Sequence, residues 1–157
     1  MLEPRTLRLE PMTVAYLEMR GAYGQIPAGF ATLYQWLATM GLAPEGMPQA
    51  VYYTNPAEVP ESESRWELWA PVAPGSPPQA TDGRGRGVKV VPARTVATAV
   101  HKGTYDSIDE TYEELWRWVA ERDYEVIGPP EEAYLTDPAE APPEEYLTQI
   151  SFPIRTP

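Results

Sequence analysis

The sequence predicts an α+β fold made of two copies of one strand–helix–strand–strand module. Three observations support this prediction: an internal repeat, one apolar pattern of helical period in each copy, and strand-like segments around each helix. The connections allow antiparallel pairing of the strands. We therefore expect an antiparallel sheet with pseudo-two-fold symmetry, with two helices on one face and a ligand groove on the other.

The repeat relates residues 13–72 to residues 95–154 at one constant shift and without insertions. Gly21 matches Gly103, and 103 − 21 = 82. About 19 of roughly 60 aligned positions are identical, and chance similarity rarely holds one register for so long. An internal duplication explains the pattern.

The whole chain, residues 1–157, is expected to form a single domain from repeats 7–72 and 89–154. Residues 73–88 join the repeats, and their proline and glycine predict a mobile surface linker. The basic residues here are too sparse for a phosphate site, so we expect a solvated loop for Arg84, Arg86 and Lys89.

In the first copy, residues 14–20 form an apolar strand that ends at a glycine. The next segment has apolar residues at steps of four, three, four and three, which is one helical face: Ile26, Phe30, Leu33, Leu37 and Met40. Gly41 stands where a C-cap glycine ends a helix. Residues 49–54, which lead into Asn55-Pro56, and residues 65–72 complete the copy as two further strands.

The second copy repeats this plan. Residues 87–91 form a lead-in strand and residues 94–101 the main strand. The helix follows, with its face at Ile108, Tyr112, Leu115, Val119 and Arg122. Strands at residues 132–135 and 146–152 close the copy.

The composition restricts the classes of partner. The net charge of −11 argues against nucleic acid and against anionic lipid, because both are bound by Lys and Arg. The sequence has no cysteine, so it has no disulfide, thiolate nucleophile or zinc–thiolate site. The first four residues lack the pattern of a signal peptide, and no apolar run approaches membrane-spanning length. A cytoplasmic protein is the expectation.

Alternation along the last strand of the first copy predicts a candidate ligand site. Trp66, Leu68 and Ala70 suit the helix-covered side, so Glu67 and Trp69 must point the other way. At the matching place in the second copy stands Gln149. An exposed indole next to a carboxylate is a platform for a flat cation. The alternative is that Glu67 is simply solvated.

Five tyrosines are candidates for the walls of this site, and for each of them core packing is an equal alternative: Tyr16, Tyr52, Tyr53, Tyr105 and Tyr134.

Catalytic patterns are sparse. No serine has an adjacent histidine partner, and for the single histidine, His101, a structural role is expected. Glu67 could act as a general base on water if a pocket desolvated it. The spacing of His, Asp and Glu suggests no metal site, and no cofactor is expected.

The chain resembles the GyrI-like family, also called the AraC-type effector-binding or small-molecule-binding domain. The resemblance rests on the order of four motifs: a strand ending in Gly21-x-Tyr23, a helix with Trp36, the strand end from Tyr52 to Pro56, and the closing strand from Glu67 to Val72. Their second-copy counterparts are Gly103-x-Tyr105, Trp118, Tyr134 to Pro138, and Gln149 to Ile154.

The resemblance implies a groove between the two repeats that binds bulky, cationic or aromatic compounds, with a buried glutamate and aromatic walls. It also implies a stand-alone form, without the DNA-binding segment to which many members are fused. Stand-alone relatives include a gyrase inhibitor and hydrolases that open cyclopropane rings. This sequence departs from the pattern at Gln149, where the first copy has Glu67.

The sequence therefore predicts a protein that binds an amphipathic, aromatic or cationic small molecule for sensing or sequestration, with no direct contact to nucleic acid or membrane. Two alternatives remain open. One is a hydrolase of strained electrophiles that uses Glu67; the other is a module that contacts gyrase or a transcription regulator.

Overall fold

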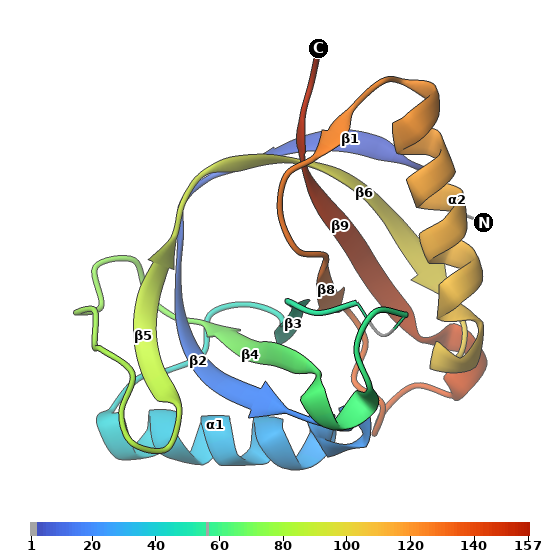
Figure 1. The fold of residues 1–157 in the computed structure, drawn as a ribbon. Helices are drawn as coiled ribbons and strands as arrows, with labels where there is room; N and C mark the ends of the chain where they lie inside the picture. Colours follow the sequence, from blue (N-terminus) through green and yellow to red (C-terminus); the bar gives the residue numbers. More distant parts are fainter. Residues whose placement is uncertain (1–2, 56) are drawn as a thin grey trace. The chain divides into compact units, whose positions relative to one another are not determined.

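The computed structural model describes residues 3–55 and 57–157. The expected strand end at Pro56 and the first two residues of the chain lie outside this described part. The chain forms two compact units: unit 1 contains Met1–Glu10 and Ala93–Pro157, and unit 2 contains Pro11–Pro92. Figure 1 shows both units, with colours that follow the chain from blue at the N-terminus to red at the C-terminus.

Unit 2 is a four-stranded antiparallel sheet with one long helix. The strands pair in the order β3–β4–β2–β5, so β2 lies between β4 and β5. The helix α1 contacts β2 and β4 (Figure 1). The bounds are β2 Met12–Arg20, α1 Ile26–Met40, β3 Gln49–Tyr52, β4 Arg65–Pro71 and β5 Arg86–Val91, with short 3-10 turns at Tyr23–Gln25 and Glu61–Glu63.

Helix α1 starts and stops at the residues that the sequence predicts. A proline occupies its first turn, where the missing N–H costs no hydrogen bond. Gly41 ends it in the left-handed conformation, with φ 71°, and its N–H bonds back to the last turn. The helix lies close to the sheet at Gly29, where an added Cβ would stand 2.6 Å from Leu68 Cδ1.

Unit 1 likewise contains antiparallel strands and one long helix. Its strands pair in the order β1–β6–β9–β8, and the short strand β7 pairs with the end of β9. The helix α2 contacts β6 and β7. The bounds are β1 Arg5–Leu9, β6 Arg94–Lys102, α2 Ile108–Glu121, β7 Glu125–Val126, β8 Glu131–Tyr134 and β9 Leu147–Arg155, with 3-10 turns at Tyr105–Ser107 and Pro143–Glu145.

The core of unit 1 forms between α2 and its sheet. Leu115 and Val119 on the helix are buried, as the predicted helical face requires. They pack with buried side chains of β6 and β9, which are Ala97, Ala99, Ile150, Phe152 and Ile154. Asp109 and Glu110 in the first turn of α2 interact favourably with its dipole.

These elements confirm the α+β class and the antiparallel pairing. The element bounds also repeat at the predicted shift: β2 starts at residue 12 and β6 at residue 94, and 94 − 12 = 82. The bounds of β3 and β8 differ by the same amount, since 131 − 49 = 82. The duplication itself stays a prediction, as does the division into repeats 7–72 and 89–154.

The lead-in strand of each copy belongs to the unit that contains the other copy. β1, which comes before β2 in the chain, pairs with β6, and β5, which comes before β6, pairs with β2. The chain passes from one unit to the other at Pro11 and Pro92, and proline cannot donate to a continuing strand ladder. Strand β5 begins at Arg86, so it includes part of the segment expected to be a mobile linker.

Within the described residues, no helix is long and apolar enough to cross a membrane.

Candidate functional site

Strand β4 sorts its side chains to the two faces of the unit 2 sheet as its alternation predicts. Leu68 lies under α1, against Gly29. Glu67 and Trp69 therefore point to the face opposite α1. The register of β2 with β4 places Tyr16 next to Trp69 on that same face.

Glu67 lies at the centre of a small cluster of polar and aromatic groups on this face. The whole Glu67 residue is 8% exposed, and the Nε1–H of Trp69 donates to its Oε1 over 2.9 Å. The ammonium of Lys89 donates to the same oxygen over 2.6 Å. We call Tyr16, Glu67, Trp69 and Lys89 the Glu67 cage.

The two rings of the Glu67 cage also face the ammonium group. Lys89 Nζ lies 4.5 Å from the centroid of the Tyr16 ring and 5.5 Å from that of Trp69. Both distances are within the range of cation–π attraction. The cage thus combines a charge pair with two aromatic rings. The sequence predicts this chemistry for Glu67 and Trp69. In the structure the cation is Lys89 of the same chain.

Two expectations about this face are wrong. Lys89 lies on β5 opposite Val14 of β2, in agreement with the lead-in strand expected at residues 87–91, but its ammonium group pairs with Glu67 instead of being simply solvated. Trp69, expected as an exposed indole, is 4% exposed. It is covered because it packs with Tyr16, Val51 and other apolar side chains in a second buried cluster.

Contacts from the turn before β5 hold Tyr16 in place. The Tyr16 hydroxyl and the Thr81 hydroxyl share a hydrogen bond. Gly87 is the residue of β5 opposite Tyr16, and an added Cβ there would stand 2.6 Å from Tyr16 Cζ. Glycine is therefore required for this ring to lie against β5.

Asp82 closes the turn that leads into β5. Its Oδ1 accepts the backbone N–H groups of Arg84 and Arg86 over 2.8 and 3.0 Å. Its Oδ2 accepts the Arg86 Nε–H over 3.0 Å. The backbone hydrogen bond from Arg86 is the main cause that lowers the pKa of Asp82 below its usual value. The turn sets the register that brings Lys89 to Glu67.

Two of the predicted tyrosines of unit 2 lie elsewhere. Tyr52 pairs with Trp66 across β3 and β4, and their rings stack at 6.3 Å. Tyr23 packs edge-on against both rings, at 5.0 and 5.4 Å. Since Trp66 alternates with Glu67, Tyr52 belongs to the face that α1 covers. Tyr53 is 41% exposed, beyond the end of β3.

The two predicted tyrosines of unit 1 lie next to each other and next to a buried carboxylate. The rings of Tyr105 and Tyr134 meet edge to face at 6.2 Å, and Tyr105 stacks on Tyr146 at 5.5 Å. The Tyr134 hydroxyl donates to Glu132 Oε1 over 3.0 Å. Burial chiefly, and then Tyr146 and Glu132, raise the pKa of Tyr105.

Glu132 was not predicted to be a site residue. It is buried, and the Tyr112 hydroxyl of α2 donates to its second oxygen. The sequence gives only a weak signal for this role of Glu132. Two adjacent glutamates start a strand here, and such glutamates are usually solvated. Here both Glu131 and Glu132 are buried.

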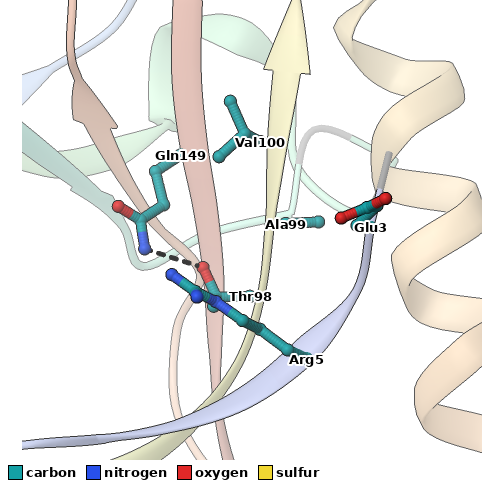
Figure 2. Close-up of a pocket in the computed structure, with 6 residues that line it drawn as sticks. All are labelled: Glu3, Arg5, Thr98, Ala99, Val100 and Gln149. Carbon is teal, nitrogen blue, oxygen red and sulfur yellow. Dashed lines mark hydrogen bonds between the residues drawn. The ribbon is translucent and has the colours of Figure 1, made fainter. Parts of the chain in front are cut away.

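Gln149 lines a cavity of about 230 Å³ on the sheet of unit 1. The other lining residues are Glu3, Arg5, Thr98, Ala99 and Val100. The Gln149 carboxamide donates to Thr98 Oγ1 over 3.1 Å. Figure 2 shows the side chains of Gln149 and Arg5 converging on Thr98. No sequence signal pointed to Glu3 or Arg5.

The single histidine of the chain, His101, has a structural role. His101 is buried, and its two ring nitrogens bond to Thr111 Oγ1 at 2.7 Å and to the Thr104 carbonyl at 2.8 Å. In the described part of the chain, no three His, Cys, Asp or Glu side chains gather in a way that could hold a metal ion.

Comparison with known families gives one match that covers most of the chain. The model of the family described as GyrI-like small molecule binding domain matches residues 2–155, which confirms the resemblance found in the sequence. No curated protein matches the chain.

Solved structures share the fold. The C-terminal domain of EcmrR superposes with a TM-score of 0.79 at 20% identity, over 99% of both chains. In its complex with DNA, EcmrR superposes with a TM-score of 0.85, also at 20% identity. That match covers 99% of this chain but spans only 58% of the length of that EcmrR chain.

Two further structures are more distant. A hydrolase from Listeria innocua has a TM-score of 0.70 at 13% identity, over 98% of this chain and 92% of that one. SAV2435 bound to tetraphenylphosphonium has a TM-score of 0.60 at 14% identity, over 98% of this chain and 94% of that one. At such identities the likeness extends to the fold alone.

Proposed function

Because this chain belongs to the GyrI-like small-molecule-binding domain family, we propose that it binds an amphipathic, aromatic or cationic small molecule and that the Glu67 cage recognises the cationic group. The expected role is sensing or sequestration of that molecule. Occupancy of the cage would be the signal that such a receptor transmits.

The position of Lys89 is the observation that supports this proposal. Its ammonium lies 2.6 Å from the Glu67 carboxylate and 4.5 Å from the centroid of the Tyr16 ring. A cation on a ligand would have the same partners available: a carboxylate for charge pairing and two rings for cation–π attraction. The cage is therefore already complementary to a cation.

Lys89 is also suited to leave the cage when a ligand arrives. Its side chain is 34% exposed, while that of Glu67 is 10% exposed. The lysine can turn its flexible stem towards solvent and keep its charge hydrated. The glutamate stays behind in a poorly hydrated place, where a cationic ligand would replace the lost partner.

A relative of the same fold supports the choice of ligand class. SAV2435 has been solved bound to tetraphenylphosphonium, a bulky aromatic cation. We use the same compound as the probe for this chain.

The test is a thermal-shift and calorimetric titration of the full chain with tetraphenylphosphonium, with uncharged triphenylphosphine oxide as the comparison compound. Binding stabilises the folded chain and raises its melting temperature. We expect the cation to bind and the neutral compound to bind at least about tenfold more weakly, a difference of about 1.4 kcal/mol.

Glu67→Gln tests the mechanism, and Glu61→Gln, an exposed residue of the same unit, is its matched control. We expect Glu67→Gln to remove the preference for the cation and Glu61→Gln to keep it. If both variants bind the cation and the neutral compound equally well, the chain still binds small molecules, but the cage does not recognise the cationic group. If tetraphenylphosphonium does not bind at all, the cationic ligand class is wrong.

We also propose that ligand binding serves the regulation of transcription in the cytoplasm, through a protein partner. EcmrR, which shares the fold, forms a complex with DNA and carries additional sequence beyond the matched part. A pull-down with and without tetraphenylphosphonium tests this role. A partner that binds equally in both conditions would contradict it.

A further inference from the structure

We propose that the cavity of unit 1 is a second binding site, for a small zwitterion that carries both a carboxylate and an ammonium group. The site consists of Glu3, Arg5, Thr98 and Gln149 and includes no residue of the Glu67 cage. It is independent of the cation site proposed above.

Strand pairing places Arg5 and Gln149 on the same face of the sheet as Thr98. Arg5 of β1 stands directly opposite Thr98 of β6, and Gln149 of β9 stands opposite Val100 of β6. Since side chains at i and i+2 share a face, Thr98 and Val100 place Arg5 and Gln149 on one side of the sheet. Figure 2 shows the Arg5 guanidinium and the Gln149 carboxamide pointing towards Thr98 from two sides.

The charged side chains of unit 1 differ in whether they form ion pairs. Arg94 binds Glu131 with two hydrogen bonds, Nε–Oε2 at 2.9 Å and Nη2–Oε1 at 2.6 Å, and both side chains are nearly buried. In contrast, Arg5 and Glu3 form no ion pair with each other or with any other residue in segments 3–55 and 57–157. The guanidinium and the carboxylate at the cavity are both available.

Gln149 and Arg5 keep hydrogen-bonding capacity that a ligand can use. Thr98 is saturated, because its hydroxyl bonds to the Ile150 carbonyl at 2.8 Å and to Ser151 Oγ at 2.9 Å and accepts from Gln149. Thr98 thereby fixes the Gln149 carboxamide, whose oxygen is left to accept from a ligand. Arg5 offers a planar fork of N–H donors that matches a carboxylate.

These groups determine the class of ligand. A carboxylate on the ligand pairs with Arg5, and an ammonium group at its other end pairs with Glu3. One positive and one negative side chain leave the site neutral, so a zwitterion is complementary while a simple anion or cation leaves one charge unmatched.

The cavity is small in comparison with the compound used to probe the cage. Its volume of about 230 Å³ lies below the roughly 300–1,000 Å³ that drug-sized ligands occupy. A short amino carboxylate therefore suits this volume better than a compound with four aryl rings.

The test uses calorimetric titration of the full chain with a series of ω-amino carboxylates, from glycine to 6-aminohexanoate. Butyrate and butylammonium serve as the monofunctional comparisons. We expect one chain length to bind best, at least about tenfold more tightly than either monofunctional compound. The best length reports the spacing between Arg5 and Glu3.

Three variants connect the binding to the site. Arg5→Gln and Glu3→Gln should each weaken the best ligand by at least about tenfold. Arg8→Gln is the matched control on the same strand, because Arg8 is exposed like Arg5 but contacts Thr95 and does not line the cavity. It should leave the affinity unchanged, as should Glu67→Gln in unit 2.

Three results would overturn the proposal: no saturable binding at millimolar concentration, equal binding of butyrate, or equal losses in Arg5→Gln and Arg8→Gln. Since Glu67→Gln is part of both experiments, failure here and failure of the cation site are separate outcomes.

Discussion

Lys89 and Glu67, 22 positions apart in the chain, form an ion pair of 2.6 Å between β5 and β4, which are separated in the sheet by β2. The pair is asymmetric, because the carboxylate is buried while the ammonium group reaches solvent. A long side chain from β5 spans the intervening strand and neutralises the carboxylate. This arrangement makes Lys89 a competitor for any cation that binds Glu67.

Replacing Lys89 should therefore strengthen cation binding. In Lys89→Met the carboxylate loses its internal partner, so tetraphenylphosphonium should bind about tenfold more tightly, as measured by calorimetry. Arg84→Met removes the same formal charge from the exposed turn nearby and is the control. An equal gain in both variants would mean that net charge, and not competition at Glu67, causes the effect.

The same pair should contribute to stability. Lys89→Met leaves the buried carboxylate of Glu67 with one hydrogen-bond donor fewer. This should lower the free energy of unfolding by about 1–2 kcal/mol. The loss stays small because the Lys89 side chain is partly exposed, so solvent already screens the ion pair. The double variant with Glu67→Gln should recover part of it. Urea denaturation of the four proteins gives the coupling energy, and a coupling near zero would contradict the pair's importance.

Gly87 should tolerate no side chain. In Gly87→Ala the new Cβ would stand 2.6 Å from Tyr16 Cζ and 2.8 Å from the Gln79 carbonyl oxygen, so the ring or the strand must move. We expect a loss of about 1–3 kcal/mol in unfolding free energy, together with loss of cation binding. Gly83→Ala, where an added Cβ meets no atom within 4 Å, should be nearly neutral in both measurements. Equal effects would exclude the close contact as the cause.

Tyr105 should show the pH dependence of a group whose pKa is raised by burial and by Tyr146 and Glu132. The unfolded chain releases this proton near the usual value of 10.0, and the folded chain releases it at higher pH. The contribution to stability is therefore complete below pH 10.0 and is lost as the pH rises through the folded pKa.

Ultraviolet titration of tyrosinate checks this prediction, with Tyr105→Phe identifying the step that belongs to this residue. Glu132→Gln should lower the pKa of Tyr105 only in part, because burial is the larger cause. An unchanged titration in Tyr105→Phe would show that the late step belongs to another tyrosine.

Local patterns in the sequence predict much of the fold because their causes are local. The apolar steps from Ile26 to Met40 and the glycine at position 41 define α1, since a helix repeats every 3.6 residues and often ends in a left-handed residue. Alternation along β4 assigns Glu67 and Trp69 to one face, since a strand repeats every two residues. The family also follows from the order of local motifs.

The sequence by itself thus determined the elements, the faces of β4 and two members of the cage, Glu67 and Trp69. Only the tertiary structure decided which residues join them. Tyr16 lies with Trp69 and Tyr52 does not, because strand register, and not composition, decides which side chains are neighbours. The ladder between β5 and β2 brings Lys89 to Glu67, and the ladder between β1 and β6 brings Arg5 to Thr98 across 98 − 5 = 93 positions. Such pairings depend on hydrogen bonds between distant segments, which no local periodicity encodes.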